Sequence, residues 1–162
     1  MDTEFIEAGP TKPIQLISIG IVSQDGRGYY AQSSEYNVSD ASEWVKENVI
    51  AKLADIAPKR RHVIAIEILK FVWPGWPERG DKPEFWGYYA DYDWVVFAQL
   101  FGTMMDLPKG FPMYCNDIKQ LGKSLGDPEL PKQGKSEHNA LADAKWNMVA
   151  YEFLLNRENR LR

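Results

Sequence analysis

Alternation of apolar and polar residues predicts β-strands in the first part of the chain. Residues 14–22 alternate and are rich in β-branched side chains, and residues 27–31 have the pattern of a returning strand. Asp25 and Gly26 between them are a common hairpin-turn pair. A further strand is expected at residues 2–5. Short connections favour antiparallel neighbours, so the chain is expected to open with three antiparallel strands.

Helical spacing of apolar residues follows. Ser39 or Asp40 can cap a helix with one apolar side, formed by Trp44, Val45, Val49 and Leu53. Residues 62–72 fit both a strand and a helix, and we favour a helix. Asn116 or Asp117 can cap a short helix that ends at Leu125. The other elements expected are a buried strand and two helices, at residues 85–90, 94–101 and 139–156.

Length and composition indicate one α/β domain over residues 1–162, because a chain of this size can bury most of its apolar surface. No apolar run approaches the length of a membrane span, and no signal peptide precedes Asp2, so no membrane association is expected. Cys115 is the single cysteine, which excludes a disulfide framework and a cysteine-based zinc site. It points to a reducing, cytoplasmic setting.

The formal net charge of −4 argues against a protein that coats nucleic acid by charge alone. A metal-dependent nuclease is still compatible with this charge, because its acidic residues bind cations that reverse the local field. Basic residues do cluster, at residues 59–61 and again near the C-terminus, and a solvated surface is the simpler explanation of both clusters.

Asp2 and Glu4 are candidate metal ligands. They are separated by one residue, so they point the same way from an extended strand. Two adjacent carboxylates repel each other, and one would normally hold a proton. A divalent cation such as Mg²⁺ or Mn²⁺ removes this conflict. The alternative is that both acids lie on the exposed face of a terminal strand.

A second group of candidates opens the last predicted helix. His138 lies on the loop before this helix, and Asp143 lies on it among small residues expected to pack inward. An aspartate in such surroundings is costly to desolvate unless a cation or a donor meets it. The alternative is a histidine near the helix cap with an exposed Asp143. Asp91 and Asp93 lie at a strand-to-helix junction, where ligands often collect in α/β proteins.

Taken in order, these elements are Asp-x-Glu, an aspartate at a strand-to-helix junction, and His-x-Ala-x-x-Asp. This order resembles the DEDDh branch of the exonuclease superfamily, which includes RNase T, oligoribonuclease and proofreading exonucleases. Nearly the whole chain is similar to small bacterial and phage 3′-5′ exoribonucleases, through DTEFIE, LISIGIVSQDGRGYYA, YDWVVFAQLFG and HNALADAKWN. The resemblance implies an RNase H-like fold with a central mixed sheet, its first three strands antiparallel, flanked by helices.

The resemblance also implies a role for each candidate. Asp2, Glu4, Asp93 and Asp143 would hold two divalent metal ions, Mg²⁺ or Mn²⁺, and His138 would be the general base. Two metals about 4 Å apart can clamp an in-line phosphoryl displacement, and histidine exchanges protons near neutral pH. The products would be nucleoside 5′-monophosphates, released from an RNA 3′ end. The choice of RNA over DNA depends wholly on the resemblance.

Two departures from the family pattern affect these assignments. Only Met1 precedes Asp2, whereas relatives have several apolar residues there. A charged α-amino group at this place could compete with a cation. Tyr89 stands where many relatives have asparagine, four residues before the third carboxylate, which makes Asp91 a rival of Asp93. We prefer Asp93 because it directly precedes the apolar turn of residues 94–97.

Other side chains are candidates for contact with the substrate: Thr3, Phe5, Lys135 and Lys145. The ring of Phe5 could stack on a terminal base, and the two lysines could reach a phosphate. The loop around Gly134 could close His138 over the substrate. Three tryptophans are expected in the core, namely Trp44, Trp94 and Trp146. The partners expected are an RNA 3′ end, possibly DNA, and a second copy in a homodimer. The alternatives are an exodeoxyribonuclease of the same mechanism and a non-catalytic binding or scaffold domain.

Overall fold

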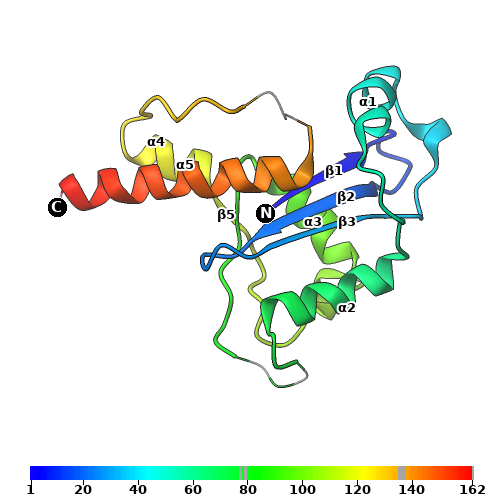
Figure 1. Cartoon of the computed structure of the whole chain (residues 1–162), viewed down its shortest axis with the longest axis horizontal. Coiled ribbons are helices and arrows are strands. Elements are labelled where there is room, and N and C mark those ends of the chain that lie inside the picture. Colours follow the sequence, from blue (N-terminus) through cyan, green and yellow to red (C-terminus); the bar gives the residue numbers. More distant parts are fainter. Residues whose placement is uncertain (77, 79, 135–137, 162) are drawn as a thin grey trace.

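The computed structural model describes residues 1–76, 78, 80–134 and 138–161 (Figure 1). Three antiparallel strands form the main sheet in the order β1-β2-β3. They are β1 (Asp2–Ile6), β2 (Gln15–Val22) and β3 (Gly28–Gln32). Gly26 adopts the left-handed conformation, φ 87°, in the turn between β2 and β3. The predicted antiparallel opening of the chain is confirmed.

Two short parallel strands, β4 (Trp86–Gly87) and β5 (Asn116–Asp117), form a second sheet beside β1. The Met1 amino group donates a hydrogen bond to the Trp86 carbonyl at 2.6 Å, which places β4 next to the start of β1. The prediction of a strand over residues 85–90 is wrong beyond Gly87. Tyr89 has a left-handed backbone, φ 54°, and this conformation cannot continue a strand.

The helices are α1 (Glu43–Asn48), α2 (Arg61–Val72), α3 (Asp91–Gln99), α4 (Ile118–Ser124) and α5 (Ala140–Leu161). Short 3₁₀ turns lie at η1 (Val38–Asp40), η2 (Ile50–Lys52) and η3 (Met104–Asp106). The helical interpretation of residues 62–72 is confirmed by α2. No helix among these described elements is long and apolar enough to cross a membrane.

The ends of three helices differ in how well the sequence predicts them. Asp117 caps α4 as predicted, accepting a hydrogen bond from the Gln120 amide. The predicted cap of α1 at residue 39 or 40 is wrong, because Ser42 accepts from the Val45 amide and residues 38–40 form η1 instead. Helix α3 begins at Asp91, before the predicted start at residue 94, so both candidate aspartates lie in its first turn.

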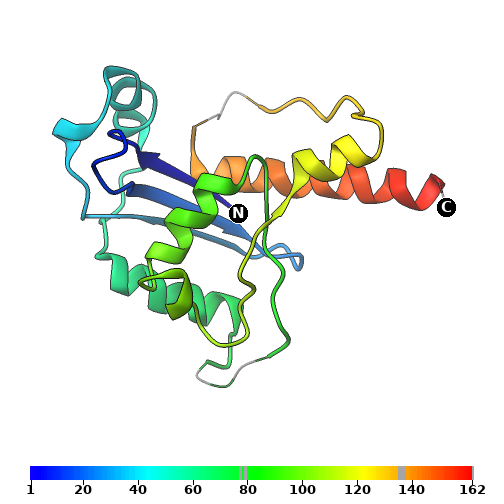
Figure 2. The same cartoon turned by 180° about the vertical axis from the view of Figure 1, so that it is seen from behind.

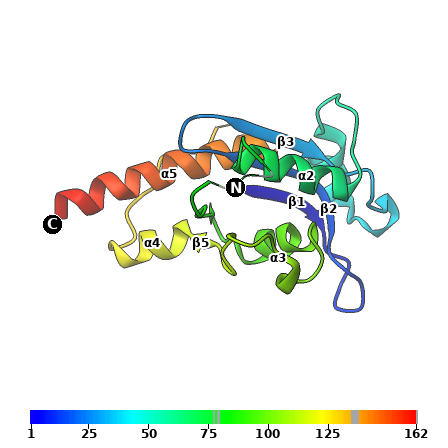
Figure 3. The same ribbon diagram turned by 90° about the horizontal axis from the view of Figure 1, so that it is seen from below.

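The two faces of the main sheet are covered by different helices. Helices α2 and α3 pack on one face over the largest apolar core, which includes Ile19, Ile64, Ile68 and Phe97. Seen from behind, α3 crosses the strands (Figure 2). On the other face, α1 packs over Ile6 and Ile17, and α5 packs against β1 and β2. The C-terminal half of α5 extends past the sheet, with α4 beside it (Figures 1 and 3).

Gly20 lets the start of α5 approach β2 closely. A Cβ atom at this position would lie only 2.1 Å from the Ala140 carbonyl oxygen, so a larger residue would push the helix away. Gly20 pairs with Asp2 across the ladder. The first turn of α5 is therefore held directly beside the acidic part of β1.

Candidate active site

Three predicted acidic residues meet on one face of the sheet. Asp2 and Glu4 pair with Gly20 and Ser18 of β2, before a bulge that follows Glu4, so both point to the face covered by α5. Asp143 reaches the same place from the first turn of α5. One carboxylate oxygen from each of Asp2, Glu4 and Asp143 lies within 4.8 Å of the other two. These oxygens form a donor set that fits a hard divalent cation such as Mg²⁺ or Mn²⁺.

Asp93 lies beside this group of three but is held separately. Its Oδ1 accepts hydrogen bonds from the amide and the hydroxyl of Thr3, at 2.7 and 2.6 Å. Both residues are buried. Thr3 therefore holds Asp93 beside β1. The amide and hydroxyl of Thr3, which was a predicted contact for the substrate, are both bonded to Asp93. Asp91 is exposed, so the geometry favours Asp93 over its rival.

Burial and mutual repulsion dominate the electrostatics. Burial, followed by the charges of Asp143 and Asp93, raises the pKa of Glu4 from 4.5 to about 8. Burial, followed by the charges of Asp93 and Asp143, raises the pKa of Asp2 well above its ordinary value. The positive charge of the Met1 amino group lowers the pKa of Asp2, but burial and the neighbouring acids outweigh it. A cation from solution would supply further positive charge to these acids.

His138 lies beside Asp143 and lines the same cavity. Its backbone amide donates to Asp143 Oδ2 at 3.0 Å, and its own backbone is left-handed, φ 67°. Its ring meets the Trp44 ring edge-on, with centroids 4.8 Å apart. A cavity of about 190 Å³ is lined by Asp2, Tyr88, Gln133, His138, Asp143, Trp146 and Asn147. A histidine, two carboxylates and room for a small ligand are therefore combined in one place.

The three tryptophans expected in the core differ in how deeply they are buried. Trp94 is buried as predicted, but Trp44 is 52% exposed, so its assignment to the core is wrong. Trp146 is partly buried and its Nε1 donates to the Pro131 carbonyl at 2.9 Å. Trp44 is exposed because α1 presents it to the start of α5 rather than to the sheet, and there it contacts His138.

Phe5 and Lys145, two other predicted contacts with the substrate, do not line the cavity beside His138. The Phe5 ring is stacked on Tyr92 of α3, with centroids 5.8 Å apart, so one side of its ring is occupied. Lys145 is exposed and lines a separate cavity with Trp146. Lys135 and the loop closure predicted around it lie outside the described residues. The roles of Phe5, Lys135 and Lys145 stay predictions.

Two residues near the acids were missed by the sequence analysis. Gln133 donates its side-chain amide to Asp143 Oδ1. Asn147 is 2% exposed and donates to the Met1 carbonyl at 2.9 Å. Asn147 follows Asp143 by four residues, so helical spacing alone places both on the same side of α5 and could have identified it.

Comparison with known proteins identifies the family of this chain. Residues 1–155 match the Rv2179c-like family, described as a 3′-5′ exoribonuclease Rv2179c-like domain. Two curated proteins of Mycobacterium tuberculosis are similar to the chain: 3′-5′ exoribonuclease MT2234.1 of strain CDC 1551 and 3′-5′ exoribonuclease Rv2179c of strain H37Rv. Each is 35% identical over 161 residues, covering 98% of this chain and 93% of the relative. The chain therefore belongs to the Rv2179c-like 3′-5′ exoribonuclease family, and it is an exonuclease enzyme, as its sequence predicts.

Proposed function

We propose that this protein is a metal-dependent 3′-5′ exoribonuclease that releases nucleoside 5′-monophosphates from RNA 3′ ends by two-metal hydrolysis. The observation that carries the proposal is the meeting of Asp2, Glu4 and Asp143 in an exonuclease-family chain, with Asp2, Asp143 and His138 lining one cavity. Asp2, Glu4 and Asp143 would hold divalent ions, with Asp93 completing the set from α3. The bound ions would activate the attacking water and stabilise the leaving 3′ oxygen.

The strand arrangement supports an RNase H-like fold. The main sheet has the order β3-β2-β1, and β4 lies beside the start of β1 and pairs in parallel with β5. Taken together, the two sheets would give the order β3-β2-β1-β4-β5, which is compatible with the mixed sheet that the resemblance implies. The acids come from β1, at the middle of this order, and from helices on either side of it.

His138 is the proposed general base, which takes a proton from the attacking water. Its backbone is tied to Asp143, and its ring rests against Trp44. These two contacts would hold the imidazole beside the acids. Asp143 thereby has two roles, because one of its oxygens orients the base and its charge contributes to the cation site.

RNA is the proposed substrate because the curated relatives are 3′-5′ exoribonucleases. An exodeoxyribonuclease of the same mechanism is the competing proposal. The family match speaks against a non-catalytic scaffold. The predicted homodimer and cytoplasmic location stay predictions.

The test uses 5′-labelled single strands of RNA and DNA, and duplexes of each with a 3′ overhang. They are incubated with Mg²⁺, Mn²⁺ or EDTA, beside a His138→Ala variant. We expect an RNA ladder that shortens from the 3′ end, disappears with EDTA, and slows at least about a hundredfold in the variant. A ladder that persists in EDTA would contradict the metal-dependent mechanism. If DNA is shortened faster than RNA, the preferred substrate is DNA.

A further inference from the structure

Asn147 on α5 is a buried polar residue that holds the backbone beside the acidic site. Its Nδ2 donates to the Met1 carbonyl oxygen at 2.9 Å, and the bond is fully buried. Its Oδ1 is buried and has no hydrogen-bond partner among the described residues. A buried acceptor without a partner costs free energy. Asn147 is therefore kept in this position at a cost, which its bond to Met1 alone does not remove.

Position along α5 connects Asn147 to Asp143. The two residues are one helical turn apart and share a side of the helix. The carbonyl that Asn147 holds belongs to the peptide group directly before Asp2. One turn of α5 thus carries a ligand candidate, Asp143, and also fixes the backbone from which another candidate, Asp2, projects.

Two glycines make this arrangement possible. Gly20 allows the start of α5 to lie against β2, and a Cβ at Gly87 would come within 3.3 Å of the Met1 carbonyl oxygen. The Met1 peptide group therefore lies tightly between β4 and α5. A small displacement of this peptide group would shift Asp2 relative to Asp143.

Repulsion among the acids explains why the bond between Asn147 and Met1 is needed. One carboxylate oxygen from each of Asp2, Glu4 and Asp143 lies within 4.8 Å of the other two, and ionised carboxylates this close repel one another, so the acids tend to move apart. A lysine at position 147 would draw the acids together but would also neutralise the charge that attracts a cation. A neutral amide holds the backbone and leaves the negative charge intact.

We propose that Asn147 is a positioning residue of the acidic site, which keeps Asp2 at the distance from Asp143 that a divalent cation requires. This inference rests on the proposed function, since it assumes that these acids bind the cation. Asn147 also lines the cavity that contains Asp2, His138 and Asp143, and a larger one of about 440 Å³ on the other side of Met1.

The test is a calorimetric Mn²⁺ titration of the wild-type protein and of Asn147→Leu, which keeps the side-chain size but removes the amide. Asn156→Leu is the matched control, because it makes the same change at an exposed position of the same helix. We expect Asn147→Leu to bind Mn²⁺ at least about tenfold more weakly and Asn156→Leu to bind as the wild type does. The Mn²⁺ concentration for half-maximal RNA cleavage should shift by the same factor, with most of the rate restored at saturating Mn²⁺.

Asp143→Asn separates failure of the inference from failure of the proposed function. If Asp143→Asn loses Mn²⁺ binding while Asn147→Leu binds as tightly as the wild type, Asn147 has only a structural role and the inference is overturned. If the wild-type protein binds no Mn²⁺, the proposed metal site and the inference fall together. Should Asn147→Leu not fold, Asn147→Ala is titrated by the same criterion, because alanine also removes the amide and is well tolerated in a helix.

Discussion

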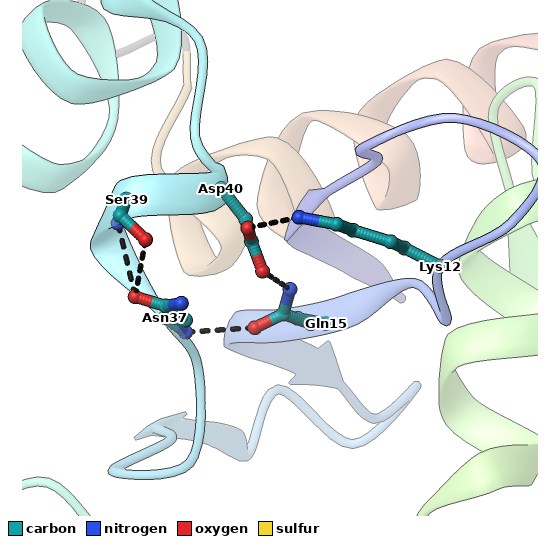
Figure 4. Close-up of polar contacts among 5 residues, drawn as sticks. All are labelled: Lys12, Gln15, Asn37, Ser39 and Asp40. Atoms are coloured by element: carbon teal, nitrogen blue, oxygen red, sulfur yellow. Dashed lines mark hydrogen bonds and ion pairs between the residues drawn. The ribbon is translucent and has the colours of Figure 1, made fainter.

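The pKa values of two carboxylates, Asp40 in η1 and Glu4 in the middle of β1, are shifted in opposite directions. Asp40 accepts hydrogen bonds from the Lys12 ammonium and the Gln15 amide, and these donors lower its pKa (Figure 4). Glu4 is buried near Asp143 and Asp93, and its pKa rises to about 8. Asp40 has its counterion in Lys12, whereas the charged groups that act on Glu4 are two further carboxylates, Asp143 and Asp93.

The difference separates a structural carboxylate from a functional one. The bonds of Asp40 fasten η1 to the start of β2, and Gln15 Oε1 extends the network by accepting from the Asn37 amide (Figure 4). Such a group is satisfied without a ligand. The acids of the site instead keep an unfavourable interaction that a bound cation would relieve, so their repulsion becomes affinity for the ion.

Replacement of a carboxylate by an amide should lower the rate of RNA cleavage most strongly at Asp143. Asp143→Asn removes a negative charge from the cation site, and we expect RNA cleavage to slow at least about a thousandfold. The rate is measured as nucleotide release from labelled RNA at fixed Mn²⁺. Asp40→Asn makes the same chemical change in the structural cluster and should keep the rate within about twofold. A variant at Asp143 that keeps more than about a tenth of the wild-type rate would contradict its role as a ligand.

The second prediction concerns stability, and it follows from the raised pKa of Glu4. The unfolded chain loses the Glu4 proton near pH 4.5, whereas the folded protein keeps it until about pH 8. The folded state binds more protons across this window, so the stability that Glu4 contributes is complete below the window and is lost as the pH rises through it. Glu4→Gln in EDTA should therefore be more stable than the wild type at pH 8, by on the order of 2 kcal/mol.

Thermal unfolding of both proteins in EDTA, at pH values from 5 to 8, measures this difference. The Tm of Glu4→Gln should exceed that of the wild type by about 4–8 °C at pH 8 and by less at pH 5. Mn²⁺ at about a hundred times its Kd should reverse the order, because it stabilises only the protein that binds it, by about 2.7 kcal/mol. Parallel Tm curves for the two proteins would mean that the pKa of Glu4 is not raised in the folded protein.

The third prediction concerns the contact between Trp44 and His138. Trp44→Leu removes the ring that supports the imidazole, and a misplaced base should lower kcat about tenfold with little change in KM. Trp44→Phe keeps an aromatic edge and should retain at least about half of the activity. Tyr114→Leu is the control, because it removes another exposed ring far along the sequence. An unchanged kcat in Trp44→Leu would show that His138 is positioned by its backbone alone.

Local patterns explain the parts of the fold and site that the sequence could predict. Strand periodicity places Asp2 and Glu4 on one face whatever they pack against. Asp25 and Gly26 specify the hairpin turn by backbone preference, and Asp117 caps α4 through a bond to a residue three positions away. Each of these features depends on neighbours in the sequence, so the sequence alone could specify it.

The features that the sequence missed depend on contacts between distant residues. Trp44 looks like a core residue on an amphipathic helix until the start of α5 is placed over it. The bond from Thr3 to Asp93 spans 90 positions, and the bond from Asn147 to Met1 spans 146. The apolar run before α3 resembles a strand, but the left-handed Tyr89 turns it early into the helix. Tertiary packing determines these features, and the periodicity of the sequence does not predict that packing.

The smallest effect is expected at Lys12, whose removal breaks the structural cluster at its most exposed point. The Lys12 side chain is 50% exposed and that of Asp40 is 15% exposed, so solvent screens the pair and Gln15 still donates to Asp40 after the change. Lys12→Met should lower the Tm by about 2 °C at most and leave Mn²⁺ affinity and RNA cleavage unchanged. Thermal unfolding and the Mn²⁺ titration measure both outcomes. A clear loss of Mn²⁺ affinity would mean that η1 positions α1 and Trp44 firmly enough to couple the two carboxylate clusters, and their separation into structural and functional groups would then fail.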